Sequence, residues 1–304
     1  MDELLRGFIG IFETAFPGRV RVCYVDGSYA DGSGVATSDV DVTLVFKEAF
    51  RDDEERQRAR ALCEYCVLLS GVELDAEVTD EAGLRRGVPP SFKLAATLVY
   101  GEDRRDNLPL VSIEQWTRDR MHSSYWRVAH LFGRPLPVRY PVDYPDPNAE
   151  FYGYDRRTVR LSGGSEAPST RDLIRLVGWA ATALIARKAG RYVARKRDCH
   201  VLYRELIGGE HADLLDDIYT QCRGRWQYLI PDNPVERRAL RDICARTLAF
   251  ENAFLLEYRT FLLGELRGAD AEGRRMALEV LERAPLADEE VTAAERALMR
   301  AEDV

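Results

Sequence analysis

Two short segments of this chain carry an apolar residue at every second position, with acidic residues on the opposite face, and this pattern constrains the fold more than any other feature. The segments are residues 40–46 and 72–79. A side-chain period of two is typical of a β-strand with one face in the core, so both segments are predicted to be strands. The acidic residues on their polar faces are Asp39, Asp41, Glu73, Asp75 and Glu77.

If the two strands are neighbours, up to five carboxylates share one small patch. Two carboxylates about 4 Å apart repel by roughly 1–4 kcal/mol at dielectric constants between those of water and a protein surface. Such a cluster needs bound cations or raised pKa values. Mg²⁺ is the natural occupant, because it prefers carboxylate and phosphate oxygens, and two ions can hold the attacking and leaving oxygens of a displacement at phosphorus. A solvated sheet face explains the alternation alone equally well.

A turn rich in small residues follows the strand predicted over residues 20–24. Gly27 lets the backbone approach a phosphate closely, and a helix that starts after it would offer free N–H donors. Ser28 follows Gly27, and Ser38 directly precedes Asp39. The turn and the carboxylates together favour a phosphate-binding site over a solvated sheet face.

The succession of Gly27-Ser28, ten further residues and Asp39-Val40-Asp41 resembles the nucleotidyltransferase (DNA polymerase β-like) superfamily. The resemblance implies a small mixed sheet with flanking helices that binds ATP or another nucleoside triphosphate and two Mg²⁺. It implies that Asp39 and Asp41 bind both metals and that Ser28 holds the β- and γ-phosphates, with Gly27 and Ser38 in the same nucleotide site.

The resemblance also implies a third acid, on the strand next to Asp39 and Asp41, that completes the metal site or acts as a base. Asp75 fits the spacing best and is the first choice for this metal ligand. Glu73 and Glu77 lie on the same predicted face, and both remain alternatives.

The second half of the chain is similar to the C-terminal helical domain of bacterial aminoglycoside adenylyltransferases that act on streptomycin and spectinomycin. A helical pattern over 171–187 and the basic residues before Asp198 carry this resemblance. It implies that Lys196, or Arg195 one residue earlier, reaches the nucleotide phosphates. Asp172 is a candidate contact for a cationic substrate, although a carboxylate in the first turn also stabilises a helix by itself.

The expected fold is an α/β (α+β) nucleotidyltransferase domain over 1–108, an aromatic- and proline-rich connection over 109–169 and an all-helical bundle over 170–304. Residues 91–100 are predicted to be helical, and residues from 287 onward a polar tail. The other predicted helices span residues 2–16, 52–69, 170–189, 196–207, 211–222, 234–266 and 271–283.

The composition excludes several other classes of protein. Lys plus Arg number 43 and Asp plus Glu number 51, so the formal net charge of −8 disfavours nucleic-acid binding and suits a cationic small substrate. No apolar run approaches the ~20 residues that span a bilayer, and the acidic N-terminus is unlike a secretory signal. The six cysteines have neither disulfide-framework nor zinc-site spacing. A cytoplasmic monomer or homodimer is expected.

The expected function is Mg²⁺-dependent transfer of AMP, or another nucleotidyl group, from ATP to a hydroxyl of a small molecule, with release of pyrophosphate. An aminoglycoside antibiotic is the candidate acceptor, which would make the protein a resistance enzyme. One alternative is transfer to a protein or a nucleotide, as in toxin–antitoxin AMP transferases and second-messenger synthases. The other is a nucleotide-binding protein that has lost catalysis.

Overall fold

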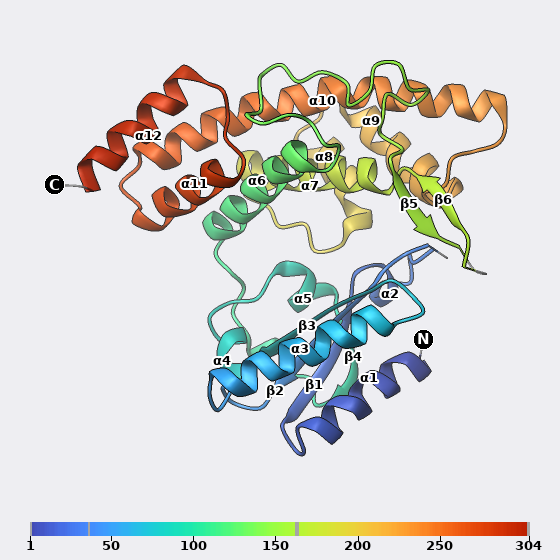
Figure 1. Cartoon of the computed structure of the whole chain (residues 1–304), viewed down its shortest axis with the longest axis vertical. Helices are drawn as coiled ribbons and strands as arrows, with labels where there is room; N and C mark the ends of the chain where they lie inside the picture. Colours follow the sequence, from blue (N-terminus) through green and yellow to red (C-terminus); the bar gives the residue numbers. More distant parts are fainter. Residues whose placement is uncertain (1, 36, 162–163, 303–304) are drawn as a thin grey trace. The chain divides into compact units, whose positions relative to one another are not determined.

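The computed structural model describes residues 2–35, 37–161 and 164–302 (Figure 1). The chain divides into two compact units. The first unit comprises Met1–Ser112 together with Val193–Asp198, and the second comprises Ile113–Tyr192 together with Cys199–Val304. Among the described residues, no helix combines the length and the apolar character needed to cross a bilayer.

The first unit is built on a four-stranded sheet with the order β3-β2-β1-β4. Strands β2 and β3 are parallel, whereas β1 pairs antiparallel with both β2 and β4, so the expected small mixed sheet is confirmed. The strands are β1 (Val20–Asp26), β2 (Val40–Phe46), β3 (Leu74–Asp80) and β4 (Thr97–Gly101).

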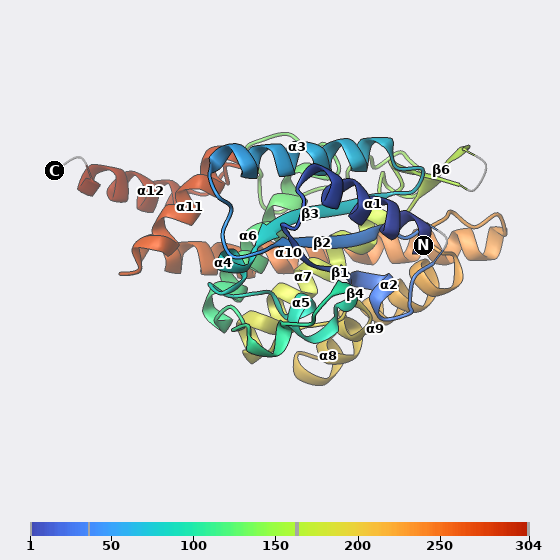
Figure 2. The ribbon, with the colours of Figure 1, turned by 90° about the horizontal axis from the view of Figure 1, so that it is seen from below.

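Helices cover both faces of this sheet (Figure 2). Helices α1 (Asp2–Ala15) and α3 (Asp53–Leu69) pack on one face, where one core cluster includes Phe12, Val42 and Leu44. Helix α5 (Pro90–Ala95) lies on the other face, where a second, smaller cluster surrounds Tyr24, Val45 and Phe92. The short elements of this unit are α2 (Gly27–Ala30), α4 (Glu81–Leu84), and the 3₁₀ turns Arg105–Asn107 and Lys196–Asp198.

The predicted helix over residues 91–100 is wrong in its second half. The helix ends at Ala95, and the next residues form β4, which pairs with β1. Thr97, Val99 and Tyr100 are β-branched or aromatic and favour a strand, which outweighs the apolar spacing that looked helical. Gly101 ends the strand with φ +83°.

The second unit is mostly helical, with one antiparallel hairpin formed by β5 (Arg157–Arg160) and β6 (Glu166–Ser169). Its longest helix, α10, runs from Pro234 to Arg267 (Figure 1). The other helices are α6 (Ile113–His130), α7 (Arg171–Ala189), α8 (Cys199–Leu206), α9 (Ala212–Asp217), the π-helical turn Ile218–Arg225, α11 (Ala271–Arg283) and α12 (Glu289–Glu302).

Two expectations for the second unit need correction. Residues 289–302 are a helix rather than a polar tail, and the helix begins where Asp288 accepts a hydrogen bond from the backbone N–H of Val291. Residues 211–222 do not form one α-helix, because α9 ends at Asp217 and the chain continues as a π-helical turn to Arg225.

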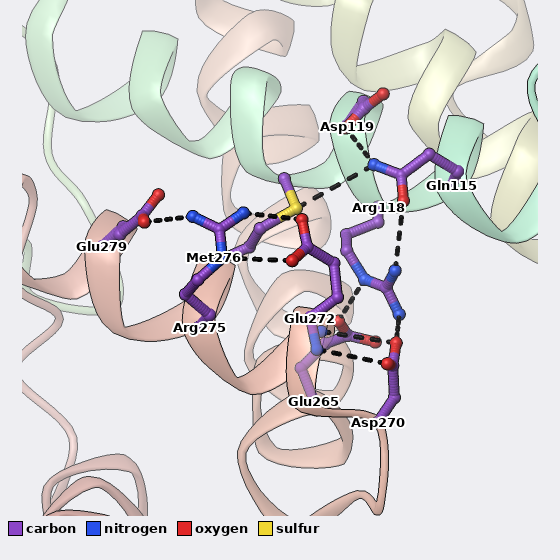
Figure 3. Close-up of polar contacts among 10 residues, drawn as sticks. Gln115, Arg118, Asp119, Glu265, Asp270, Glu272, Arg275, Met276 and Glu279 are labelled. Atoms are coloured by element: carbon purple, nitrogen blue, oxygen red, sulfur yellow. Dashed lines mark hydrogen bonds and ion pairs between the residues drawn. The ribbon is translucent and has the colours of Figure 1, made fainter. Parts of the chain in front are cut away.

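Ion pairs fasten α6 to α10 and to the start of α11 in the second unit (Figure 3). The guanidinium of Arg118 on α6 donates to Glu265 on α10 and to Asp270, which caps α11. Gly273 lies beside this pair, where a Cβ would force the end of the Glu265 side chain to shift. Deeper in the unit, the buried carboxylate of Glu251 accepts two hydrogen bonds from Arg134, at 2.7 and 2.8 Å.

Candidate active site

The register of the sheet places three aspartates side by side at one end. Asp26, the last residue of β1, is opposite Asp41 in the antiparallel pair β1–β2. Asp41 is in turn opposite Asp75 in the parallel pair β2–β3. The ends of three adjacent strands therefore bring carboxylates together that are up to 49 positions apart in the sequence.

Asp39, Asp41 and Asp75 form a group that we call the carboxylate cluster. Each offers one carboxylate oxygen, and these oxygens all lie within 4.8 Å of one another. Asp39 and Asp41 are partly buried and Asp75 is exposed. Three converging carboxylate oxygens are the ligand type that Mg²⁺ prefers.

Neither of the alternatives for the third acid belongs to this cluster. Glu77 lies two residues further along β3, where its carboxylate accepts a hydrogen bond from the Thr43 hydroxyl at 3.0 Å. Glu73 precedes β3, and its carbonyl accepts a hydrogen bond from the Val40 N–H. The geometry thus favours Asp75 among the three candidates.

Asp41 has an environment unlike water, and its carboxyl group is strongly perturbed by it. Burial raises the pKa of its carboxyl group to about 6; the positive charge of Lys196 acts in the opposite direction, and the nearby charges of Asp39, Asp26 and Asp75 raise the pKa further. Its Oδ2 atom is buried and has no hydrogen-bond partner in the described part of the chain. A buried carboxylate oxygen that lacks a donor and faces two further carboxylates fits a divalent cation.

Gly27 is required by the geometry of this site. Its φ of +68° is accessible to glycine at little cost, and a Cβ at this position would overlap Asp41 Oδ2. The side chain of Asp26 accepts a hydrogen bond from the Gly27 N–H at 2.6 Å, which fixes the start of α2. Ser28 follows as a buried residue in the same turn.

Ser38, predicted to belong to the nucleotide site, is buried in the loop before β2. Its hydroxyl accepts a hydrogen bond from the Val35 N–H at 3.0 Å, and its own N–H donates to the Val35 carbonyl at 2.9 Å. Both contacts hold the loop that leads into Asp39. The structure therefore gives Ser38 a loop-forming role.

Lys196 lies in a segment, Val193–Asp198, that belongs to the first unit although it lies between two helices of the second. Its charge lowers the pKa of Asp41. The neighbouring Arg197 ties the segment to the turn after α2. Its Nη1 donates to the Asp31 carbonyl at 3.1 Å, and its Nε lies 3.5 Å from Asp31 Oδ2.

Sequence reasoning did not single out Asp26, Asp31 or Arg197. The position of Asp26 directly before Gly27 was the available signal for the first of these, because a capping aspartate commonly precedes a tight turn. The Asp31–Arg197 contact joins residues 166 positions apart, and no local pattern marks it.

Asp172, the candidate substrate contact, is buried in the second unit. Its Oδ1 accepts a hydrogen bond from Arg157 Nη1 at 3.2 Å and lies 4.0 Å from Arg175 Nη1. A cationic substrate would have to compete with these two guanidinium groups for the carboxylate.

Comparison with known proteins agrees with this geometry. Residues 5–87 match the family model of the nucleotidyltransferase domain, so the first unit contains this domain. No curated protein matches the chain.

Two solved structures resemble the chain at low identity. A candidate nucleotidyltransferase from Sulfolobus solfataricus is 23% identical, with a TM-score of 0.26, over 34% of this chain and 81% of its own. Spectinomycin adenyltransferase AAD(9) from Enterococcus faecialis, solved with ATP and spectinomycin, is 11% identical, with a TM-score of 0.40, over 81% of this chain and 97% of its own.

Proposed function

We propose that this protein transfers an AMP group from ATP to a hydroxyl of a small-molecule acceptor and releases pyrophosphate. The observation that carries the proposal is the carboxylate cluster, which lies beside the Gly27-Ser28 turn in a nucleotidyltransferase domain. Three carboxylate oxygens that converge within 4.8 Å of one another, next to a glycine–serine turn, suit nucleotide chemistry better than a structural role.

The metal fits the residues that are present. We propose that Asp39, Asp41 and Asp75 hold Mg²⁺, as two ions, and the unpartnered Asp41 Oδ2 supports this assignment. When bound there, Mg²⁺ would neutralise the charge of the phosphate oxygens and orient the donor nucleotide.

The chain's own residues perform the remaining tasks. The Gly27-Ser28 turn faces the phosphates of the donor, and the Ser28 hydroxyl donates a hydrogen bond to the β- or γ-phosphate. Lys196 stabilises the negative charge that develops on pyrophosphate as it leaves. Asp75, the exposed acid, accepts the proton of the acceptor hydroxyl while that oxygen bonds to the α-phosphorus and the bond to the bridging oxygen breaks.

Pyrophosphate release with ATP and Mg²⁺ over a panel of hydroxylated acceptors tests this proposal. Aminoglycosides come first in the panel, because the second half of the chain resembles adenylyltransferases that modify them. Asp39→Asn should abolish release, since the variant removes a charge from the proposed metal site. Glu77→Gln is the matched control, because Glu77 lies on the same face of β3 as Asp75 but does not belong to the carboxylate cluster.

The outcome separates the proposal from its alternatives. Release that needs one small acceptor and fails in Asp39→Asn supports the proposal. Release without an added acceptor would indicate self-modification or transfer to a second nucleotide. Equal rates in Asp39→Asn and the unmodified protein would contradict the assigned role of the cluster.

A further inference from the structure

Two arginines in the second unit stack on tryptophan rings and form what we call the arginine–tryptophan cluster. The guanidinium carbon of Arg127 lies 3.5 Å from the centroid of the Trp179 ring. The guanidinium carbon of Arg120 lies 4.1 Å from the Trp179 centroid and 4.4 Å from that of Trp116. Trp116, Arg120 and Arg127 are on α6 and Trp179 is on α7, so the cluster lies where these two helices pack.

Positive charge exceeds negative charge around this cluster. Neither Arg120 nor Arg127 forms an ion pair with a carboxylate within the described ranges, and Arg127 Nη1 donates a hydrogen bond to the Ser123 carbonyl at 3.0 Å. The positive charge of Arg175 also acts on Arg127. The negative charge of Asp172 acts on Arg127 in the opposite direction, and its carboxylate already serves Arg157 and Arg175.

The two guanidinium groups are held in this arrangement at an electrostatic cost. Burial lowers the pKa of Arg120 to about 10, with only the charge of Asp119 opposing the shift. Burial lowers the pKa of Arg127 to about 10 as well, and the charges of Arg120 and Arg175 lower it further. Arg120 Nε is buried and has no hydrogen-bond partner in the described part of the chain.

Other arginines of the same unit show what a structural pairing looks like. Arg118 and Arg134 meet carboxylates at hydrogen-bond distance, and both have raised pKa values as a result of these partners. Arg120 and Arg127 differ, because their flat faces are covered by tryptophan while part of their N–H capacity is unused. A guanidinium group fixed by stacking, with free N–H donors, is preorganised for an oxyanion.

We propose that the arginine–tryptophan cluster is a binding site for an oxyanion, a phosphate or carboxylate group, carried by a small-molecule ligand of the second unit. This ligand would be anionic, unlike a cationic aminoglycoside. The charges around Arg120 and Arg127 determine the sign of the ligand that binds there more directly than the net charge of −8 of the whole chain does.

Tryptophan fluorescence reports on this site, because two of the four tryptophans of the chain, Trp116 and Trp179, belong to the cluster. We therefore propose to titrate the full chain with inorganic phosphate in metal-free buffer. A saturable fluorescence change is expected, with a Kd on the order of 1 mM, which is typical of a few charged hydrogen bonds to a small ion.

Variants assign the signal to the two arginines. Arg120→Gln and Arg127→Gln should each weaken phosphate binding at least tenfold, and Arg120→Lys should bind more tightly than Arg120→Gln. Arg187→Gln is the matched control, because Arg187 on α7 also stacks on an aromatic ring, Phe261, at 5.3 Å. It should bind phosphate within twofold of the unmodified protein. Circular dichroism and thermal melting verify that each variant is folded.

Two results would overturn the proposal. The first is the absence of a saturable fluorescence change with phosphate, or a change that Arg120→Gln and Arg127→Gln leave unaltered. The second is loss of the phosphate signal at saturating ATP and Mg²⁺, since the site would then serve the donor's triphosphate. Both readouts are binding measurements, so they stand apart from pyrophosphate release, whose failure would contradict the proposed function alone.

Discussion

The first unit concentrates negative charge in its carboxylate cluster, whereas the second unit concentrates positive charge in its arginine–tryptophan cluster. At the sheet end, Asp39, Asp41 and Asp75 converge within 4.8 Å. At the α6–α7 contact, Arg120 and Arg127 share the ring of Trp179. Each arrangement costs free energy in the unliganded chain, and each contains a buried polar atom without a partner in the described ranges.

The two clusters differ in how the backbone creates them. Strand register brings Asp41 and Asp75 together, because they are opposite each other in the parallel pair β2–β3, and Asp39 directly precedes β2. The arginines depend on side-chain stacking between two helices. We conclude that the anionic site is set by topology and the cationic site by packing, and the following predictions test this contrast.

The largest effect is expected for Asp41→Asn. Loss of this charge should lower nucleotidyl transfer by about 1,000-fold or more, as expected when preorganised charge is removed from a transferring phosphoryl group. The same change should raise the Tm, because a carboxylate with a raised pKa destabilises the folded state at neutral pH. Pyrophosphate release and thermal melting measure the two effects, and a lower Tm would show that the acids do not strain the unliganded fold.

The second unit offers the opposite case, a buried charge that is fully paired. Glu251→Gln should lower the free energy of unfolding by about 3–5 kcal/mol, because Arg134 would be left buried without its carboxylate. Glu257→Gln, on the same helix in a half-exposed pair with Lys188, should cost less than about 1 kcal/mol. Chemical denaturation compares the two, and equal costs would contradict the account.

Gly27→Ala tests how closely the turn fits the carboxylate cluster. The added Cβ would overlap Asp41 Oδ2 in a backbone with φ +68°, so we expect a loss of about 1–3 kcal/mol in stability together with a loss of transfer. Gly34→Ala is the control, since a Cβ there would meet its nearest atoms at 3.6 Å. Similar losses in both variants would mean that the loop as a whole, rather than Gly27, is sensitive.

The smallest effect is expected for Arg197→Gln. This change removes the contact with Asp31 that holds the segment of Lys196, so the KM for ATP should rise about tenfold, equivalent to about 1.4 kcal/mol, while kcat falls less. Arg195→Gln, in the same exposed segment, should change the KM by less than twofold. Steady-state kinetics with varied ATP measure both, and the reverse ranking would move the phosphate contact to Arg195.

The first unit was largely predictable from the sequence because its key residues follow local rules. The alternation around Asp41 and Asp75 predicts the strands, and Gly27-Ser28 predicts the turn. The register that selects Asp75 over Glu73 and Glu77 depends on the pairing of β2 with β3, which the alternation does not specify. The strand over residues 97–101 was missed, since apolar spacing in a short segment fits a helix and a strand alike.

The second unit was less predictable because its important contacts join distant residues. Arg120 and Trp179 are 59 positions apart and meet only when α6 packs on α7. Asp172 illustrates the same limit, because a carboxylate in the first turn of a helix gives no sign that Arg157 will occupy it. The helix over 289–302 did carry a local signal, since Asp288 and two glutamates precede its apolar residues.

The central claim, that the carboxylate cluster serves nucleotidyl transfer, is tested most directly by following the phosphate that moves. The protein is incubated with Mg²⁺ and the acceptor panel, in parallel with ATP labelled at the α-phosphate and ATP labelled at the γ-phosphate. The account predicts that the acceptor gains label only from the α-labelled nucleotide, and that Asp41→Asn gains none. Label from the γ-phosphate would show a kinase, and label that persists in Asp41→Asn would contradict the role assigned to the cluster.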